Sequence, residues 1–217
     1  MTGYTVVDME QWPRKDHYAY YTQKLNVGYS MTIRLDVTKL LDCCHQNGYK
    51  FYPTFIYCVT SVINRTEALR MFQNQEGELC IWDDVMPNYT IFHEDDSTFS
   101  DCWTAFSSDF VTFYRAITDD MERYQDIKGI KAKPGQPANF FCISCVPWID
   151  FTGYSNYVAG GTPQFFPIIT FGKYTRKEDT VEMPFNLTIA HAVCDGYHTG
   201  CFFRDLQEEI NNFRVDK

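Results

Sequence analysis

Apolar residues alternate strictly with small, polar or charged residues over positions 27–35, and this pattern constrains the fold of the chain more than any other feature of the sequence. The apolar positions are Val27, Tyr29, Met31, Ile33 and Leu35, and the positions between them are Gly28, Ser30, Thr32 and Arg34. Successive side chains of a β-strand point to opposite faces, so this period of two gathers the apolar set on one face. The segment therefore predicts a strand with one apolar face.

Helical and strand patterns alternate along the rest of the chain. Apolar residues at helical spacing predict a helix that follows Asp36 as N-cap and stops at Asn47-Gly48, and another with Pro53 in its first turn. A long amphipathic helix is expected over 110–124, and a final helix is expected to begin near Tyr197. Strands are expected at about 89–93, 139–146, 165–174 and 181–190, with a turn at 76–78. The predicted class is mixed α/β.

Composition limits the size and the partners of this fold. The chain has 217 residues, of which 45% are hydrophobic, so we expect one domain over residues 1–217. Its formal net charge of -9 repels phosphate backbones and argues against nucleic acid as a partner. No apolar run approaches the length that spans a membrane, and the first residues do not resemble a secretory signal. We therefore expect a cytoplasmic protein with no membrane partner.

The nine cysteines imply no disulfide framework, and their one Cys-x-x-Cys motif does not indicate a metal site. Without an export signal, we expect them to be reduced thiols. One Cys-x-x-Cys motif joins Cys142 and Cys145, but it lies in a predicted strand, where residues three apart point to opposite faces. Two thiols placed in this way cannot share a metal ion.

His191 is the clearest candidate for a catalytic residue. It is expected where the strand over 181–190 ends, and Asp195-Gly196 provides a turn before the final helix. A histidine at such a position can exchange a proton with a bound hydroxyl near neutral pH, which suits a general base. Taken alone, a histidine is more often structural.

Two other interpretations use the same segment. His191, Cys194, His198 and Cys201 are spaced three, four and three apart, which on one continuous helix would place four zinc ligands side by side. The helix is expected to begin after Gly196, which would leave the first two off its surface. A thiol nucleophile at Cys194 or Cys201, activated by one of the histidines, is also conceivable, although no third, orienting residue is evident. Burial as small hydrophobic residues is the simpler interpretation of these cysteines.

Short motifs accompany this segment along almost the whole chain. They are Trp12-Pro13-Arg14-Lys15, Lys50-Phe51-Tyr52-Pro53, Gly77-Glu78-Leu79, Ile81-Trp82-Asp83, Phe92-His93-Glu94, Ser144-Cys145-Val146-Pro147-Trp148, Gly172-Lys173-Tyr174 and the His-x-x-x-Asp-Gly pattern of His191–Gly196. In this order they resemble the chloramphenicol acetyltransferases, which are coenzyme A-dependent acyltransferases. Many relatives carry a second histidine before the catalytic one, where this chain has Ala190, and the residues at Cys145 and Val146 also vary in the family.

The resemblance implies direct acetyl transfer from acetyl-coenzyme A to a drug hydroxyl. His191 would take the proton from the C3 hydroxyl of chloramphenicol, and that oxygen would attack the thioester without an acetyl-enzyme intermediate. Ser144 matches the serine that donates a hydrogen bond to the oxyanion, and Thr170 matches a threonine that holds a water nearby. Asp195 matches an aspartate that pairs with an arginine, here Arg14, and so fixes the loop that carries the base.

The same match assigns the binding residues. It places Lys50 and Lys173 near the phosphates of coenzyme A, and Tyr52 and Tyr174 near its adenine. The antibiotic pocket would be lined by Tyr20, Tyr21, Leu25 and Phe141.

The resemblance also implies an architecture and a set of partners. It implies a two-layer α/β (α+β) sandwich, a mixed β-sheet packed by helices, that assembles as a homotrimer with active sites at the subunit interfaces. Chloramphenicol and acetyl-coenzyme A would be the ligands, with no metal. Two alternatives remain. One is another acetyl-coenzyme A-dependent O- or S-acyltransferase, such as a dihydrolipoamide acyltransferase core, although no lipoyl domain or linker is present. The other is a non-catalytic drug-binding homologue, which would have no need of His191, Ser144 and Thr170.

Overall fold

The computed structural model describes residues 3–156 and 164–215. Its strands are β1 (Tyr4–Val6), β2 (Gly28–Asp36), β3 (Met71–Gln73), β4 (Leu79–Trp82), β5 (Met86–His93), β6 (Thr98–Trp103), β7 (Phe140–Val146), β8 (Ile168–Gly172), β9 (Thr175–Lys177) and β10 (Thr180–Ala190). Its helices are α1 (Lys15–Gln23), α2 (Thr38–Asn47), α3 (Phe51–Arg65), α4 (Phe110–Tyr124) and α5 (Gly196–Asn212), with a 3₁₀ turn η1 (Glu67–Leu69).

A mixed seven-stranded sheet forms one layer of the molecule. Its strand order is β2-β10-β8-β7-β5-β6, and β9 extends the hairpin that leads into β10. The neighbours β5, β7 and β8 run parallel, whereas the other pairs are antiparallel. A separate three-stranded sheet has the order β1-β4-β3 and lies near α1. The carboxyl ends of the three parallel strands therefore meet at one edge of the large sheet.

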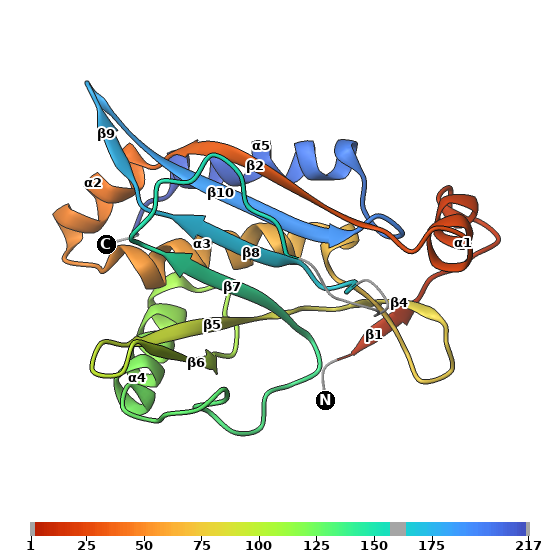
Figure 1. Ribbon diagram of the computed structural model, residues 1–217, viewed down its shortest axis with the longest axis horizontal. Helices are drawn as coiled ribbons and strands as arrows, with labels where there is room; N and C mark the ends of the chain where they lie inside the picture. Colours follow the sequence, from red (N-terminus) through yellow and green to blue (C-terminus); the bar gives the residue numbers. More distant parts are fainter. Residues whose placement is uncertain (1–2, 157–163, 216–217) are drawn as a thin grey trace.

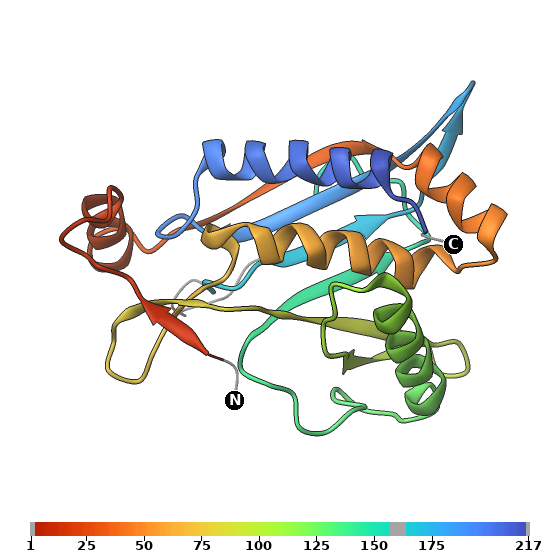
Figure 2. The same ribbon diagram turned by 180° about the vertical axis from the view of Figure 1, so that it is seen from behind.

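The helices α2, α3, α4 and α5 form the second layer and cover one face of this sheet. They lie behind the strands in Figure 1 and in front of them in Figure 2. Between the layers lies the hydrophobic core, which includes the fully buried Leu35, Phe55, Phe141, Phe185 and Leu187. The opposite face of the sheet is crossed by residues 147–156, and no helix of the described ranges covers it (Figure 1). The predicted two-layer class with a mixed sheet is confirmed.

Most of the predicted elements are present. The alternating segment forms β2, and the predicted helices form α2, α3, α4 and α5 within a few residues of their expected limits. Gly48 has a φ of 71°, a left-handed conformation that glycine adopts readily, and it ends α2 as expected. Asp36 is not itself the N-cap of α2, which is Val37, but its carboxylate accepts a hydrogen bond from the backbone N–H of Thr38 at 2.9 Å.

The sequence-based prediction did not include β1, β6, β9 or α1, and it made one strand too long. The strand expected over 165–174 is shorter, because β8 ends at Gly172 and the chain turns at Lys173 and Tyr174 before β9. The helix α1 was not predicted, and none of its residues is buried. A helix without a buried face has no apolar stripe, so the periodicity that reveals the other helices is absent from its sequence.

None of the described helices combines the length and the apolar composition needed to cross a membrane.

Candidate active site

His191 lies in the short turn between the last strand and the last helix. It follows β10 directly, and its backbone N–H still donates to the carbonyl of Val27 at 3.0 Å. The turn ends at Asp195, whose carboxylate accepts two backbone N–H groups at the start of α5. This N-cap satisfies donors that a helix leaves unpaired. The predicted order of strand, histidine, turn and helix is confirmed.

Contacts on several sides fix the His191 ring. Its face stacks on Tyr21 with ring centroids 4.1 Å apart and an interplanar angle of 12°, and its edge meets Tyr29 at 5.2 Å. The ring atom Nδ1 lies 3.2 Å from the backbone carbonyl of Cys194. A carbonyl oxygen only accepts, so Nδ1 carries the proton and Nε2 is left with a free lone pair. The imidazole is thereby oriented as a base through Nε2.

Arg14 ties the N-terminal segment to this turn. Its guanidinium forms an ion pair with Asp195 and also donates to the backbone carbonyl of His191 at 3.1 Å. The side chains of Arg14 and Asp195 are 12% and 29% exposed, so the pair is largely removed from water. The pairing of Arg14 with Asp195 predicted from the sequence is present. It holds the backbone on which the base is mounted.

Asp195 has a further partner and is ionised at neutral pH. Its Oδ1 lies 2.7 Å from Nδ1 of His198. Partial burial raises the pKa of Asp195, but the hydrogen bond with His198 and the positive charge of Arg14 outweigh burial and bring the pKa to about 2. The carboxylate therefore interacts with two basic side chains, His198 on α5 and Arg14 in the N-terminal segment. It does not contact the His191 ring.

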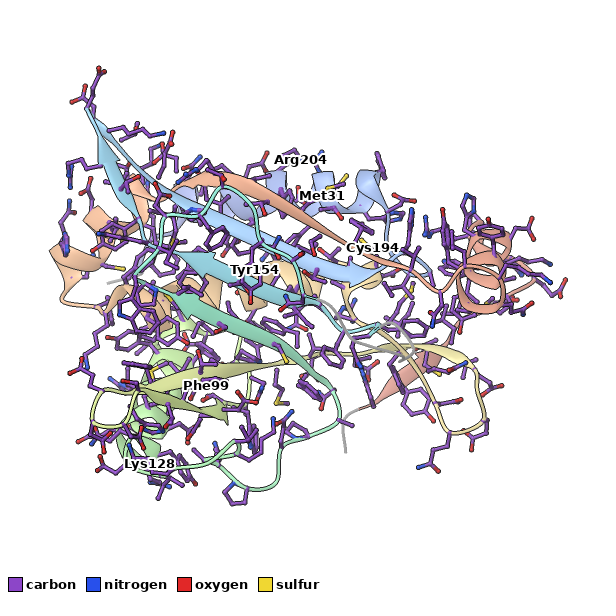
Figure 3. The ribbon with its side chains drawn as sticks, viewed as in Figure 1. Met31, Phe99, Lys128, Tyr154, Cys194 and Arg204 are labelled. Carbon is purple, nitrogen blue, oxygen red and sulfur yellow. The ribbon has the colours of Figure 1, made fainter. Side chains whose placement is uncertain are left out.

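The side chains considered as zinc ligands do not converge. Cys194 is buried, with its sulfur 3.5 Å from the Tyr29 hydroxyl, at the end of β10 nearest α1 (Figure 3). His198 is directed at Asp195 instead. Within residues 3–156 and 164–215, no group of three or more His, Cys, Asp or Glu side chains is placed to hold a metal ion. Burial also raises the pKa of the Cys194 thiol, which disfavours the thiolate that a nucleophile requires.

Polar side chains form a row across the open face of the sheet. Ser144 on β7 pairs in register with Thr170 on β8, which pairs with Asn186 on β10. The Ser144 hydroxyl also lies 3.2 Å from the hydroxyl of Thr90 on β5. Residues at one register position of neighbouring strands point to the same face. The row ends beneath the loop that follows β7, where the Asn186 amide donates to the carbonyl of Tyr154 at 2.8 Å (Figure 3).

A groove with a volume of about 1180 Å³ lies at the carboxyl ends of the parallel strands. Its walls come from the ends of β5, β7 and β8, from the first turn of α3 and from the last turns of α4. Sites at the carboxyl ends of parallel strands are usual in α/β sheets. The N-terminal end of α3 adds partial positive charge at this edge. Such a groove suits a large ligand that carries phosphate.

All four residues assigned to the cofactor line this groove, but they are not equivalent. They are Lys50, Tyr52, Lys173 and Tyr174. Tyr174 is 50% exposed and offers its ring to a ligand, with only an edge contact to Phe51. The Tyr52 hydroxyl donates to the backbone carbonyl of Thr90 at 2.9 Å, and the ring packs near Phe171. Tyr52 therefore forms a wall of the groove.

The groove also contains residues to which the sequence assigned no role. Trp148 is 60% exposed and makes an edge contact with the ring of Phe92, with centroids 4.8 Å apart. Both belong to motifs noted in the sequence, and the signal was an aromatic residue near the end of a strand, within β5 for Phe92 and just beyond β7 for Trp148. Glu94 and Glu122 line the groove as well, so its charge is not uniformly positive.

Three of the four residues assigned to the drug pocket belong to α1 or closely follow it, and the fourth does not. Tyr21 stacks on the imidazole, Tyr20 contacts Tyr21 with ring centroids 5.2 Å apart, and Leu25 follows the same helix and is 49% exposed. Phe141 lies in the hydrophobic core with no exposed surface. Phe141 lies three positions before Ser144 in β7, and an odd spacing in a strand puts two side chains on opposite faces. Its side chain therefore points to the helices. The assignment of Phe141 to an accessible pocket was wrong for this reason.

The base and the row of hydroxyls lie at different places on one chain. Asn186 shares the row with Ser144, and His191 follows it by five residues along β10. A rise of about 3.4 Å per residue separates His191 from the row by about 17 Å along the strand, and β8 and β10 add about 10 Å across it. A single chain therefore cannot bring both groups to one reacting carbonyl.

Known proteins resemble this chain over almost its whole length. A family model described as chloramphenicol acetyltransferase matches residues 2–207. A chloramphenicol acetyltransferase of Proteus mirabilis is 39% identical over 206 residues, which cover 95% of this chain and 94% of the relative, and one of Clostridium perfringens is 37% identical over 212 residues, which cover 98% and 97%. A solved structure of a chloramphenicol acetyltransferase superposes with a TM-score of 0.84 at 20% identity and covers 96% of this chain and all of its own.

Proposed function

Because the chain belongs to the chloramphenicol acetyltransferase family, we propose that it transfers acetyl from acetyl-coenzyme A to the C3 hydroxyl of chloramphenicol. It is an acyltransferase, and the product would no longer carry the free hydroxyl, which would confer resistance. The observation that carries the proposal is the His191 imidazole, oriented as a base beside accessible aromatic side chains. Acetyl-coenzyme A is an intracellular metabolite, so we place the reaction in the cytoplasm.

His191 acts as the general base in this proposal. Nε2 takes the proton from the drug hydroxyl while that oxygen attacks the thioester carbonyl. The resulting imidazolium returns the proton to the departing sulfur, so the products are the acetyl ester and free coenzyme A. A positioned base contributes roughly 10² to 10⁴ in rate. The contacts with Tyr21, Cys194 and Arg14 keep the ring in this orientation.

Ser144 stabilises the oxyanion that forms on the thioester carbonyl. Its hydroxyl is mounted on a central strand, so it is held in place before the reaction begins. Loss of one such donor typically costs about 10² to 10³ in turnover. Thr170, the register neighbour of Ser144, is assigned the water near the tetrahedral intermediate, which is a smaller contribution.

The groove residues hold acetyl-coenzyme A as the second substrate. Lys50 and Lys173 supply positive charge for its phosphates, and the half-exposed ring of Tyr174 supplies a flat surface for adenine. Trp148, which is also exposed, extends this surface toward the Ser144 end of β7. The volume of the groove, about 1180 Å³, is large enough for a nucleotide joined to a flexible arm.

The active enzyme is a homotrimer in which one subunit supplies His191 and its neighbour supplies Ser144. The distance between these residues along one sheet supports this arrangement, since both must reach the same tetrahedral centre. The open face of the sheet, which carries Ser144, is available to the neighbouring subunit.

The reaction is tested by mixing the protein with acetyl-coenzyme A and chloramphenicol and measuring release of the coenzyme A thiol together with the acetylated drug. Thiol release should require the drug, and an analogue with fluorine in place of the C3 hydroxyl should give none. Release with dihydrolipoamide but not with chloramphenicol would favour the other acyltransferase. Tight drug binding with no thiol release would favour a non-catalytic homologue.

The shared site is tested with mixed oligomers. Subunits carrying His191→Gln and subunits carrying Ser144→Ala are each nearly inactive alone. When the two kinds of subunit are refolded or expressed together, part of the wild-type activity should return. Some interfaces then pair an intact His191 from one subunit with an intact Ser144 from the other, and the active site at such an interface has both groups. No recovery in oligomers shown to contain both subunits would contradict a site between subunits.

A further inference from the structure

We infer that Thr90 is a positioning residue that orients the Ser144 hydroxyl toward the reacting carbonyl, an inference that rests on the proposed role of Ser144. Thr90 lies on β5, next to β7, and the two hydroxyl oxygens are 3.2 Å apart. The paired register of β5 and β7 ends at Tyr89 and Ile143, one residue before this contact. The contact between the two hydroxyls therefore joins β5 and β7 at the point where their backbone pairing ends.

The direction of this hydrogen bond decides whether Ser144 can act. If Ser144 donated to Thr90, its only proton would be used and none would be left for an oxyanion. If Thr90 donates, Ser144 keeps its proton and is also polarised into a stronger donor. The bond to Ser144 is the one hydrogen bond recorded for the Thr90 hydroxyl among residues 3–156 and 164–215. Its proton thus has no competing protein acceptor in that part of the chain.

Thr90 is itself held more firmly than a typical surface threonine. Its β-branched side chain has few rotamers. The Tyr52 hydroxyl donates to its backbone carbonyl at 2.9 Å, and Tyr52 is packed against Phe171. Thr90 also lines the groove proposed for acetyl-coenzyme A. A chain of contacts therefore runs from the groove wall through Tyr52 and Thr90 to the oxyanion donor.

The experiment compares Thr90→Val, which removes the hydroxyl and keeps the shape, with Thr90→Ser, which keeps the hydroxyl. Both are made in the wild-type chain and in Ser144→Ala, and kcat and KM are measured for both substrates. In the wild-type chain, Thr90→Val should lower kcat by roughly five- to tenfold, the usual contribution of one hydrogen bond, with each KM changed less than about twofold. Thr90→Ser should restore most of kcat. In the Ser144→Ala chain, Thr90→Val should have no further effect.

The matched control removes a threonine hydroxyl that lies outside the polar row and the groove. Thr98 on β6 donates its hydroxyl to the Asp96 carboxylate at 2.6 Å. Thr98→Val should leave kcat within about twofold of wild type, the range expected of a change away from the reacting atoms. Thermal unfolding of every variant shows whether the fold is intact.

The outcomes separate this inference from the proposed function. Unchanged kcat in Thr90→Val, an equal loss in Thr90→Ser, or an equal loss in the Ser144→Ala background would each overturn the role of Thr90 while leaving Ser144 as the oxyanion donor. Wild-type turnover in Ser144→Ala would overturn both. A large rise in the KM for acetyl-coenzyme A with kcat unchanged would assign Thr90 to binding instead.

Discussion

The two ends of the sheet differ in how much of their site is already built. At the end of β10, the base is enclosed by contacts within one chain: a stacked ring, a carbonyl that fixes the tautomer, and an ion pair that holds the backbone. At the carboxyl ends of β5, β7 and β8, the groove is open, and its aromatic side chains are half-exposed. The end of β10 holds one side chain in a fixed orientation, whereas the groove end leaves space for a large ligand.

This difference separates the effects expected of mutations. Changes at the enclosed end should alter the orientation of a reacting group and appear mainly in kcat. Changes at the open end should remove surface that contacts the ligand and appear mainly in the KM for acetyl-coenzyme A.

Replacing His191 with Gln should lower kcat by about 10² to 10⁴, because the side chain keeps a similar size but cannot take a proton. The KM for acetyl-coenzyme A should change little, since the groove lies elsewhere. Steady-state kinetics with each substrate varied in turn make the measurement. His45→Gln, a change on α2, is the matched control and should be fully active. More than a tenth of wild-type kcat in His191→Gln would contradict the division.

Breaking the ion pair with Arg14→Met should loosen the turn that carries the base. The pair is largely buried, so we expect a loss of about 2 to 4 kcal/mol in unfolding free energy, near the range for buried pairs. Because a misplaced base costs up to roughly 10² in rate, kcat should also fall. Chemical denaturation and kinetics measure the two effects. Asp205→Asn removes an exposed ion pair on α5 and should cost less than about 1 kcal/mol.

Asp195 also predicts how stability depends on pH. Its pKa is about 2 in the folded chain and about 3.9 in a model peptide, so the folded state favours the carboxylate. The stabilisation is complete above about pH 4 and is lost as the pH falls toward 2. Asp195→Asn should therefore be less stable than wild type at neutral pH, and the difference should shrink between pH 4 and pH 2. A difference that stays constant over that range would contradict the assigned pKa.

The arrangement around His191 was largely predictable from the sequence. For the groove, the sequence predicted which residues are present but not how each one is placed. The turn at His191 is local, since a strand, a turn and a helix follow each other within a few residues, and each leaves a pattern. The partner of Asp195 is 181 positions away, and only the resemblance supplied it. Tyr52 and Tyr174 received the same role because residue type alone does not show that one hydroxyl is tied to a neighbouring strand.

Two errors have different physical origins. Phe141 was placed in a pocket although it lies in the core, because a strand residue changes faces with a shift of one position. The helix α1 was missed because nothing in it is buried, yet it supplies the ring that stacks on His191. Periodicity reveals a helix by the residues that face a core, so the contact of α1 with His191 is recognised only in the folded chain.

Gly172 lies in the open groove, and the loop that delivers Trp148 to this groove passes directly over it. A Cβ added at this position would lie 2.6 Å from the carbonyl oxygen of Ile149 and 2.8 Å from the Phe151 ring. Gly172→Ala should therefore displace the loop, cost about 1 to 3 kcal/mol in stability and raise the KM for acetyl-coenzyme A. Gly153→Ala, in the same loop with no atoms near its added Cβ, is the matched control. Equal effects of the two changes would show that the close approach at Gly172 is not the cause.

The smallest effects should distinguish the two tyrosines of the groove. Tyr174→Ala removes a half-exposed ring, so the KM for acetyl-coenzyme A should rise by about five- to thirtyfold, the lower part of the range for an aromatic ring stacked on a base. Stability should hardly change. Tyr52→Phe keeps the ring and removes the hydrogen bond to Thr90, so it should cost about 0.5 to 1.5 kcal/mol in unfolding free energy and leave this KM within about twofold. If Tyr52→Phe raised the KM as much as Tyr174→Ala, the Tyr52 hydroxyl would contact the ligand, and the groove wall would itself be part of the binding surface.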